Sequence, residues 1–242
     1  MNTYRAPLWR RFLWRCCTLL WLWVLATVVG VAFRGAVNPP TTAFMQEKQL
    51  EALAKGSKAH IQYHWVDYGA ISPYMRLAVV AAEDQNFPYH HGFDWEAMSA
   101  ALEHNARNRH VRGGSTISQQ TAKNLWLWPG RSYLRKLVEA WFTVLIEVEW
   151  SKQRILETYL NVAQLDDYTF GVGAAAQLSF GVRAWELTPE QAALLAAALP
   201  EPDRVDVTEP SAFMQKRQAW ILEQMEELGG PDYLDDIEQP RR

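Results

Sequence analysis

Residues 112–124 read RGGSTISQQTAKN, and no other stretch of the chain is as informative. The pair Gly113 and Gly114 lets the backbone approach a ligand closely. A helix is predicted to follow, and its N-terminal amides would face the glycine pair, an arrangement that binds anions. Gln119 and Lys123 are four residues apart and share a face of that helix. The Gly-x-x-x-x-Gly-Lys-Ser/Thr spacing of a nucleotide P-loop is absent, so the stretch predicts an anion site of another kind.

Charge is unevenly spread along the 242 residues, whose net charge is −3. Residues 103–136 carry seven Lys or Arg against one acid, within a region after residue 34 that is otherwise acidic. Such a basic island favours an anionic ligand, with a solvated charged face as the equal alternative. Apolar residues at 49% exclude global disorder, and two Cys exclude a disulfide-stapled scaffold.

The N-terminus has the pattern of a membrane anchor. Residues 16–33 contain no charge, and a helix needs ~20 apolar residues to cross the hydrocarbon core. Four Arg precede this run and one follows it, so the positive-inside rule assigns residues 1–15 to a cytoplasmic tail. A cleaved signal peptide is the alternative, but the run ends in Val-Ala-Phe-Arg, a poor cleavage site. We expect a transmembrane helix over 16–33 and a stalk over 34–44.

The rest of the chain is predicted to be a mainly α domain over 45–230, followed by a frayed acidic tail over 231–242. Alternating apolar residues predict one strand over 60–67. Helix-start and helix-stop signals predict helices over 45–55, 74–83, 94–108, 117–126, 132–150, 151–161, from 188 onward and over 211–228.

Glu83 and Asp84 close a strongly apolar helix. A Glu among apolar neighbours resists ionisation and becomes a proton acceptor or donor near neutral pH. The plainer interpretation is that Glu83 marks the point where the helix meets water, and this pair alone favours it. Asp84 faces elsewhere on the helix and is expected to orient the following loop.

Residues 125–131 read LWLWPGR, which suits a membrane interface or a helix end packed on the core. Arg131, Arg135 and Glu139 follow at intervals of four. An exposed Arg135–Glu139 pair would contribute under ~1 kcal/mol. Glu139 has chemical interest only if it faces a cleft shared with Glu83.

Several catalytic patterns are absent from the sequence. His90 and His91 belong to no His-Glu-x-x-His pattern, so a zinc hydrolase is not expected and His90 is interpreted as structural. There is no Gly-x-Ser-x-Gly elbow. No Ser-x-x-Lys or Lys-Thr/Ser-Gly occurs, which predicts no penicillin-reactive serine and no transpeptidase activity.

Four motifs follow one another in order: EDQNFPYHHGFD at 83–94, RGGSTISQQTAKN at 112–124, RKLVE at 135–139 and KQRILETYLN at 152–161. Together they resemble the family 51 glycosyltransferase domain of class A penicillin-binding proteins and the monofunctional peptidoglycan transglycosylases. The resemblance covers residues 60–205. It implies a mainly α, lysozyme-like domain with a small membrane-contacting jaw.

The resemblance also implies the reaction. Lipid II is polymerised into β-1,4-linked glycan with inversion, and undecaprenyl pyrophosphate is released. Glu83 would act as the base on the acceptor 4-hydroxyl, and Glu139 would be the second essential carboxylate. Substrate contacts are implied for Ser115, Thr116, Gln119, Gln120, Lys123, Asn124, Arg131, Arg135 and Lys136. Structural or orienting roles are implied for Asp84, Phe87, His90, Gly92, Gly113, Gly114 and Asn161.

The expected partners are lipid II, the growing glycan and membrane lipids, with cell-wall synthesis or division proteins as candidates and no nucleic acid. The expected location is the bacterial inner membrane, single-pass, with the catalytic domain on the periplasmic side. A divalent metal, Mg²⁺ or Mn²⁺, is a candidate at the diphosphate. Asp166, Asp167 and Ser179 depart from the family pattern near the acceptor path. A lytic enzyme of the same fold and a non-catalytic membrane-tethered protein are the alternatives.

Overall fold

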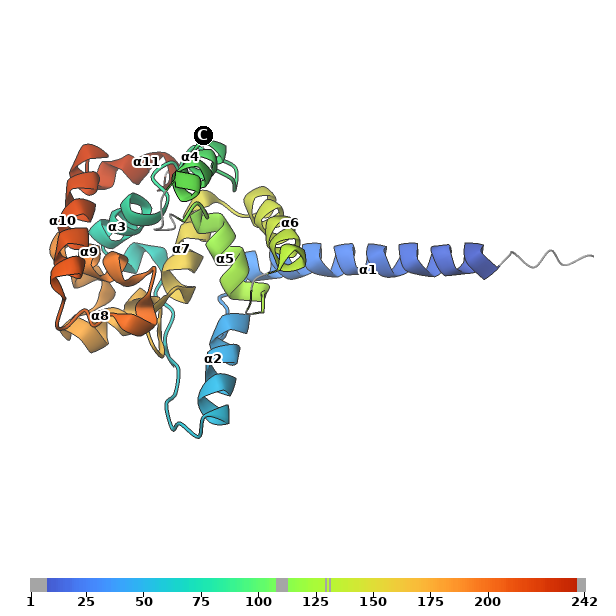
Figure 1. The fold of residues 1–242 in the computed structure, drawn as a ribbon, viewed down its shortest axis with the longest axis horizontal. Coiled ribbons are helices and arrows are strands. Elements are labelled where there is room, and N and C mark those ends of the chain that lie inside the picture. Colours follow the sequence, from blue (N-terminus) through green and yellow to red (C-terminus); the bar gives the residue numbers. More distant parts are fainter. Residues whose placement is uncertain (1–7, 108–112, 129, 131, 239–242) are drawn as a thin grey trace, which may run out of the picture.

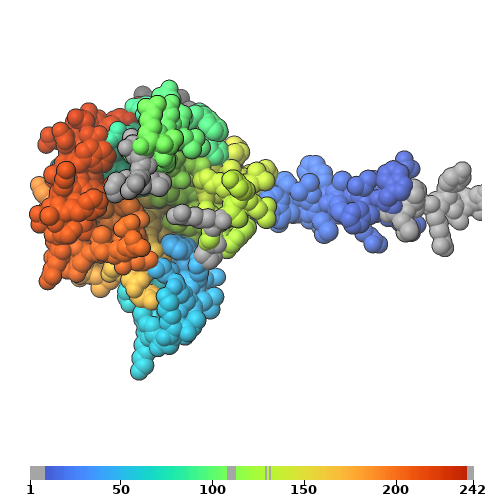
Figure 2. Space-filling view, viewed as in Figure 1, coloured from blue at the N-terminus to red at the C-terminus, as the bar shows by residue number. Residues whose placement is uncertain are grey.

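One long helix, α1 (Leu8–Ala36), projects from a helical domain, and its surface is largely uncovered by the rest of the chain (Figures 1 and 2). This computed structural model describes residues 8–107, 113–128, 130 and 132–238. Within those ranges, α1 is the one helix long and apolar enough to cross a membrane. It contains the predicted span 16–33.

The domain is made mainly of helices. They are α2 (Ala43–Ala54), α3 (Pro73–Glu83), α4 (Trp95–Arg107), α5 (Ile117–Trp126), α6 (Tyr133–Glu149), α7 (Lys152–Val162), α8 (Gly171–Phe180), α9 (Pro189–Ala198), α10 (Ala212–Glu227) and α11 (Asp235–Glu238). The predicted helices from α2 to α7 and at α9 and α10 are present within a residue or two of their expected bounds. The sequence analysis missed α8 and α11.

Polar caps explain why several helix starts were predictable. Thr116 and Thr188 each accept a hydrogen bond from the third amide of the helix that follows, α5 or α9. Gln119 and Gln191 return a bond to the cap backbone, which completes two capping boxes. A cap of this kind contributes ~1 kcal/mol, so the local sequence fixes where each helix begins.

The end of α1 and the link to α2 are bonded to the domain, so the expected stalk over 34–44 is not a free spacer. In the link, Arg154 donates to Oδ1 of Asn38 at 2.8 Å and Tyr63 donates its hydroxyl hydrogen to the carbonyl of Pro39 at 2.6 Å. Arg154 donates to the carbonyl of Arg34 at 3.1 Å. The indole N–H of Trp150 donates to the carbonyl of Val31 at 2.9 Å. The end of α1 is thereby fixed to α6 and α7, because buried or capped carbonyls need such partners.

Two groups of helices enclose the core. α9 packs against α3 and α10, while α5 packs against α6 and α7 (Figure 1). α3 joins the groups, because its apolar residues are buried and it also contacts α7. Glu83, the last residue of α3, therefore lies where the two groups meet.

A small sheet of three short strands completes the domain. Its strands are β1 (Gln62–Tyr63), β2 (Gln164–Asp166) and β3 (Thr169–Phe170), in the order β1-β3-β2. β1 is parallel to β3 and β2 is antiparallel to it. The predicted strand over 60–67 is therefore right in kind but only two residues long.

The expectation of a frayed tail is wrong for residues 231–238, which pack on the domain. Leu234 is 1% exposed. Glu238 accepts hydrogen bonds from Tyr68 at 2.8 Å and from Arg76 at 2.6 Å. A buried apolar side chain and a paired carboxylate outweigh the repulsion among the acidic residues that suggested disorder.

We predict that Leu234→Ala lowers the free energy of unfolding by about 2–4 kcal/mol, because it removes a fully buried side chain. The exposed neighbour Asp235 supplies the control variant Asp235→Ala. Thermal or urea unfolding measures both. Equal stability of the Leu234 variant and the wild-type protein would show that this segment does not belong to the folded domain.

Candidate active site

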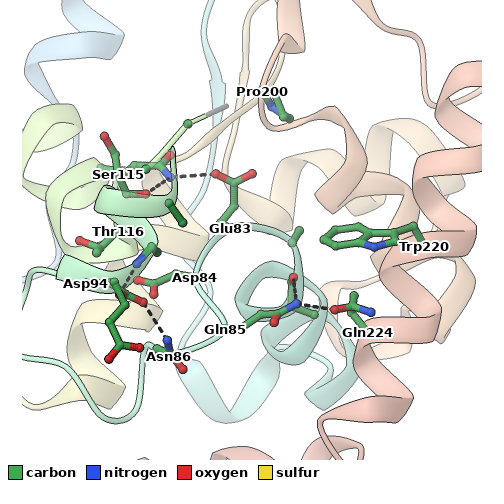
Figure 3. Close-up of a pocket in the computed structure, with 18 of the residues that line it drawn as sticks. Glu83, Asp84, Gln85, Asn86, Asp94, Ser115, Thr116, Pro200, Trp220 and Gln224 are labelled. Atoms are coloured by element: carbon green, nitrogen blue, oxygen red, sulfur yellow. Dashed lines mark hydrogen bonds between the residues drawn. The ribbon is translucent and has the colours of Figure 1, made fainter. Parts of the chain in front are cut away.

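Two adjoining cavities lie between the helix groups. The first, about 960 Å³, contains Glu83 and Arg217 and is called the Glu83 cavity here (Figure 3). The second, about 490 Å³, contains Lys123 and is called the Lys123 cavity. Gln120 and Pro200 line both cavities, so they mark the boundary between them, and both acidic and basic side chains line each cavity.

Side chains from three helices hold the carboxylate of Glu83, which is 15% exposed. Gln120 of α5 donates its Nε2 hydrogen to Oε2 of Glu83 at 2.8 Å. Tyr159 of α7 donates its hydroxyl hydrogen to Oε1 of Gln120 at 3.1 Å, which fixes the amide orientation. Arg217 of α10 places a guanidinium nitrogen 3.7 Å from Oε1 of Glu83. The carboxylate is therefore fixed in direction.

The proton affinity of Glu83 is set by opposing effects. Burial raises the pKa of its carboxyl group, while the Gln120 hydrogen bond and the charges of Arg217 and Lys123 lower it. Burial is the largest of these effects, so the pKa lies above the ordinary value for Glu. A carboxylate of this kind is a better proton acceptor than one in water.

Lys123 is linked electrostatically to both predicted carboxylates. Burial lowers the pKa of its ammonium group, as do the nearby charges of Arg135 and Lys136. Glu139 and Glu83 act in the opposite direction. Because its side chain is partly buried and lines a cavity, its charge is weakly screened and acts strongly on an anionic ligand.

Glu139 is buried, so of the two interpretations offered by the sequence, an exposed ion pair with Arg135 does not apply. Its side chain is 3% exposed. Arg135 donates to Oε2 of Glu139 at 3.1 Å, and Lys136 bonds to Oε1. Glu139 lines neither cavity and instead holds two cations in fixed positions. Its loss would leave those cations without their anionic partner.

The start of α5 is occupied by the protein itself. The Ile117 amide donates to Oδ2 of Asp84 at 2.9 Å, and the Gln119 amide donates to Oγ1 of Thr116 at 3.2 Å. The sequence predicted an external anion at this helix N-terminus. The carboxylate of Asp84 holds that place, where the helix dipole favours negative charge.

His90 holds the loop after α3. Its Nδ1 accepts a hydrogen bond from the Gly92 amide at 3.1 Å, so its Nε2 carries the hydrogen that it donates to Asp84 at 2.9 Å. Thr116 donates its hydroxyl hydrogen to the carbonyl of Gly92 at 2.7 Å. Phe87, fully buried, packs edge-on to the His90 ring. These residues tie the loop to α5.

The other predicted site residues fall into three groups. Gly113, Gly114, Ser115 and Thr116 line the Glu83 cavity. Asn124 lines the Lys123 cavity, and its buried Oδ1 has no hydrogen-bond partner among the described residues. Gln119 is buried in the capping box, and Asn161 is buried and bonded to the backbone of Val66, so neither lines a cavity. Arg131 lies outside the described residues.

The sequence analysis missed three residues near Glu83. Arg217, Trp220 and Gln224 line the Glu83 cavity from α10. Their spacing of three and four residues puts them on one helical face, but no local pattern indicates that this face meets Glu83. Asp167, noted as a departure from the family pattern, pairs with Lys48 at 3.4 Å.

The described residues do not offer a ready-made metal centre. Among them, no group of three or more His, Cys, Asp or Glu side chains is placed to hold a metal ion. Both carboxylate oxygens of Glu139 already bond to cations. Mg²⁺ is often held by one or two carboxylates together with substrate phosphates, so the substrate would have to supply most ligands.

The domain is thus helical, with a buried, oriented glutamate in one cavity and a partly buried lysine in the next. The model of the transglycosylase family matches residues 47–226, and the chain belongs to that family. Its fold is the lysozyme-like helical fold of transglycosylase domains.

Three curated relatives resemble the chain over nearly their whole length, and each is named biosynthetic peptidoglycan transglycosylase. The protein of Xanthomonas oryzae pv. oryzae is 50% identical over 214 residues, 88% of this chain and 87% of that protein. The protein of Pseudomonas fluorescens is 47% identical over 233 residues, 96% of this chain and 97% of that protein. The protein of Xanthomonas axonopodis pv. citri is 48% identical over 231 residues, 95% of this chain and 93% of that protein.

We predict that Gln120→Leu raises the pKa of Glu83 further, because it removes a hydrogen bond to the charged carboxylate. A ¹³C-NMR titration of Glu-labelled protein measures this pKa, with the Glu83 resonance assigned from Glu83→Gln. Gln224→Leu alters the same cavity without touching Glu83 and should leave the pKa unchanged. A lower pKa in the Gln120 variant would contradict this account of the carboxylate.

Proposed function

We propose that this chain polymerises lipid II into β-1,4-linked glycan strands, with Glu83 as the base. The supporting observation is a buried carboxylate in the Glu83 cavity that is bonded to Gln120, a residue that also lines the neighbouring Lys123 cavity. A cavity of about 960 Å³ has the size of a small-molecule site rather than a packing defect.

The nucleophile is the 4-hydroxyl oxygen of the acceptor sugar. Glu83 removes its proton, the oxygen attacks the anomeric carbon of the donor, and the bond from that carbon to the diphosphate oxygen breaks. Attack opposite to the leaving group inverts the configuration at this carbon. The raised pKa of Glu83 improves its proton affinity, and the bond from Gln120 aims Oε1 into the cavity by holding Oε2.

The diphosphate leaves with the electron pair and needs stabilisation of its developing charge. Lys123 supplies a partly buried cation that lines the cavity adjoining that of Glu83. Arg135 and Lys136 add positive charge and are held by Glu139. Preplaced charges of this kind reduce the barrier without reorganisation during the reaction. Undecaprenyl pyrophosphate is the released product.

The proposed location is the periplasmic side of the bacterial inner membrane. α1 provides a single span, and the Arg residues before it favour a cytoplasmic N-terminus. α6 lies against α1, where the rings of Trp23 and Trp141 are 5.6 Å apart. Exposed apolar residues of α6, including Leu137 and Val148, would contact the lipid tails of the bilayer that displays the substrate.

We propose separately that a divalent cation, Mg²⁺ or Mn²⁺, binds to the diphosphate of the substrate. No step of the proposed reaction depends on a metal, because Lys123 would supply positive charge for the leaving diphosphate. Addition of a chelator and then of Mg²⁺ or Mn²⁺ to the polymerisation assay tests for a requirement.

We predict that Glu83→Gln abolishes polymerisation, because the amide cannot accept the proton. The thermal midpoint should be at least as high as that of the wild type, because a buried charge is removed. Labelled lipid II and detergent-solubilised protein are incubated and glycan ladders are read on a gel. Glu96→Gln, an exposed carboxylate of the same cavity, is the control and should stay active.

The assay separates the alternatives. A ladder formed by the Glu83 variant would remove this residue from the mechanism. Release of soluble muropeptides from finished cell wall, without a ladder, would support a lytic enzyme. Bound lipid II that is never turned over by the wild type would support a non-catalytic protein.

We predict that Lys123→Met lowers kcat/KM by about 10² or more, by analogy with the loss of one charge-stabilising donor. Lys216→Met is the matched control, because Lys216 is exposed on α10 and lines neither cavity. An undiminished rate in the Lys123 variant would show that another group stabilises the leaving diphosphate.

A further inference from the structure

Trp220 presents a large uncovered indole inside the Glu83 cavity. Its side chain comes from α10 and is 42% exposed, although it lines a concave site. Figure 3 shows the ring extending from α10 toward Glu83, with Ser115 and Thr116 on the opposite side of the cavity. An aromatic face in such a position is available to a ligand.

The position of this indole is fixed by its helix. Met214, Ile221 and Met225 of α10 are buried, and α10 packs extensively on α9 and α3. Arg217 and Trp220 therefore lie on the face turned toward the cavity, and the first of them approaches Glu83. The ring is held by a well-packed helix, so little conformational entropy would be lost when a ligand binds to it.

The indole N–H of Trp220 has no hydrogen-bond partner among the described residues. Trp65, Trp141 and Trp150 differ, because each donates its indole hydrogen to a side chain or carbonyl of the chain. Trp150 is buried, whereas Trp220 is open to the cavity. A donor at the edge of an exposed ring can bond to a hydroxyl or carbonyl oxygen of a ligand.

We infer that Trp220 is a stacking platform for a pyranose ring of the sugar substrate next to Glu83. This inference rests on the proposed function and adds a residue that positions the acceptor hydroxyl. One face of a pyranose carries C–H groups with partial positive charge, and the indole face is negative, so the two attract and shed water. The hydroxyls at the ring edge stay free for polar contacts.

The opposite wall leaves room for such a ring. Ala97, Ala100, Gly113 and Gly114 line it, and none of them has a bulky side chain. Polar groups stand around the space, among them Gln224, which accepts a hydrogen bond from Gln85 at 2.7 Å. A flat apolar face with amides and a carboxylate at its margin matches the two-sided chemistry of a hexose better than that of a lipid tail.

The test compares Trp220→Ala and Trp220→Phe in lipid II polymerisation. We expect Trp220→Ala to raise KM about tenfold with kcat within about threefold, which is the size of one aromatic contact. Trp220→Phe keeps a stacking face and should stay within about threefold of the wild-type KM. Phe213→Ala, 73% exposed on the same helix and outside both cavities, is the control and should not change KM.

A second readout is direct binding of the lipid-free disaccharide pentapeptide to the Glu83→Gln protein, measured by isothermal titration calorimetry, which needs no tryptophan as reporter. The binding heat should persist when Phe213→Ala is added to that protein and be lost when Trp220→Ala is added. Unchanged KM and unchanged binding in Trp220→Ala would overturn the inference, as would an equal loss in Phe213→Ala. A third result would separate the two proposals: the wild type makes no glycan, and Trp220→Ala still abolishes binding of the disaccharide pentapeptide. That result would overturn the proposed function but support the contact between Trp220 and the sugar.

Discussion

The carboxylate of Asp84 accepts hydrogen bonds from the first amide of α5 and from His90, and the rest of the site depends on these bonds. They join the end of α3 to the start of α5. Glu83, the residue before Asp84, is thereby brought against Gln120, which lies one turn into α5. The carboxylate of Asp84 borders the same cavity as Glu83, but its oxygens are bonded to the helix start and to His90. Two adjacent carboxylates thus differ in their partners: Asp84 joins α3 to α5, and Glu83 is bonded to Gln120.

The same division applies to the positive charges. Arg135 and Lys136 pair with the buried Glu139, so their charges are fixed before any ligand arrives. Lys123 lines a cavity, and burial lowers the pKa of its ammonium group. Burying a cation costs free energy of folding, and an anionic ligand would offset this cost. If Lys123 binds the diphosphate as proposed, the site trades stability for function.

The sequence predicts the helices well because their ends carry local signals. Thr116 and Thr188 with their glutamines define two helix starts through bonds within four residues. The motifs also placed Glu83, Gln120 and Lys123 in one site, through resemblance to a family. What failed depends on contacts distant in sequence. Three findings are of this kind: Glu139 is buried by packing, Asp84 bonds to an α5 amide 33 residues away, and Arg217 approaches Glu83 from α10. No local pattern reports such contacts, and the acidic composition of residues 231–238 concealed the buried Leu234.

The attachment of α1 has a consequence for how the cleft meets its substrate. Trp141 donates its indole hydrogen to Thr27, and Trp150, the residue after α6, donates to the carbonyl of Val31. The end of α6 is therefore bonded to α1 at two positions along that helix. A Cβ on Gly35 would lie 2.7 Å from the Trp150 ring, which shows how closely the two elements approach. α6 also carries Arg135, Lys136 and Glu139. The helix that carries Arg135 and Lys136 is therefore fixed to the candidate membrane helix. If α1 spans the bilayer as proposed, this rigid connection would hold both cations at a constant height above it, where a lipid-linked diphosphate lies, and a flexible stalk would not.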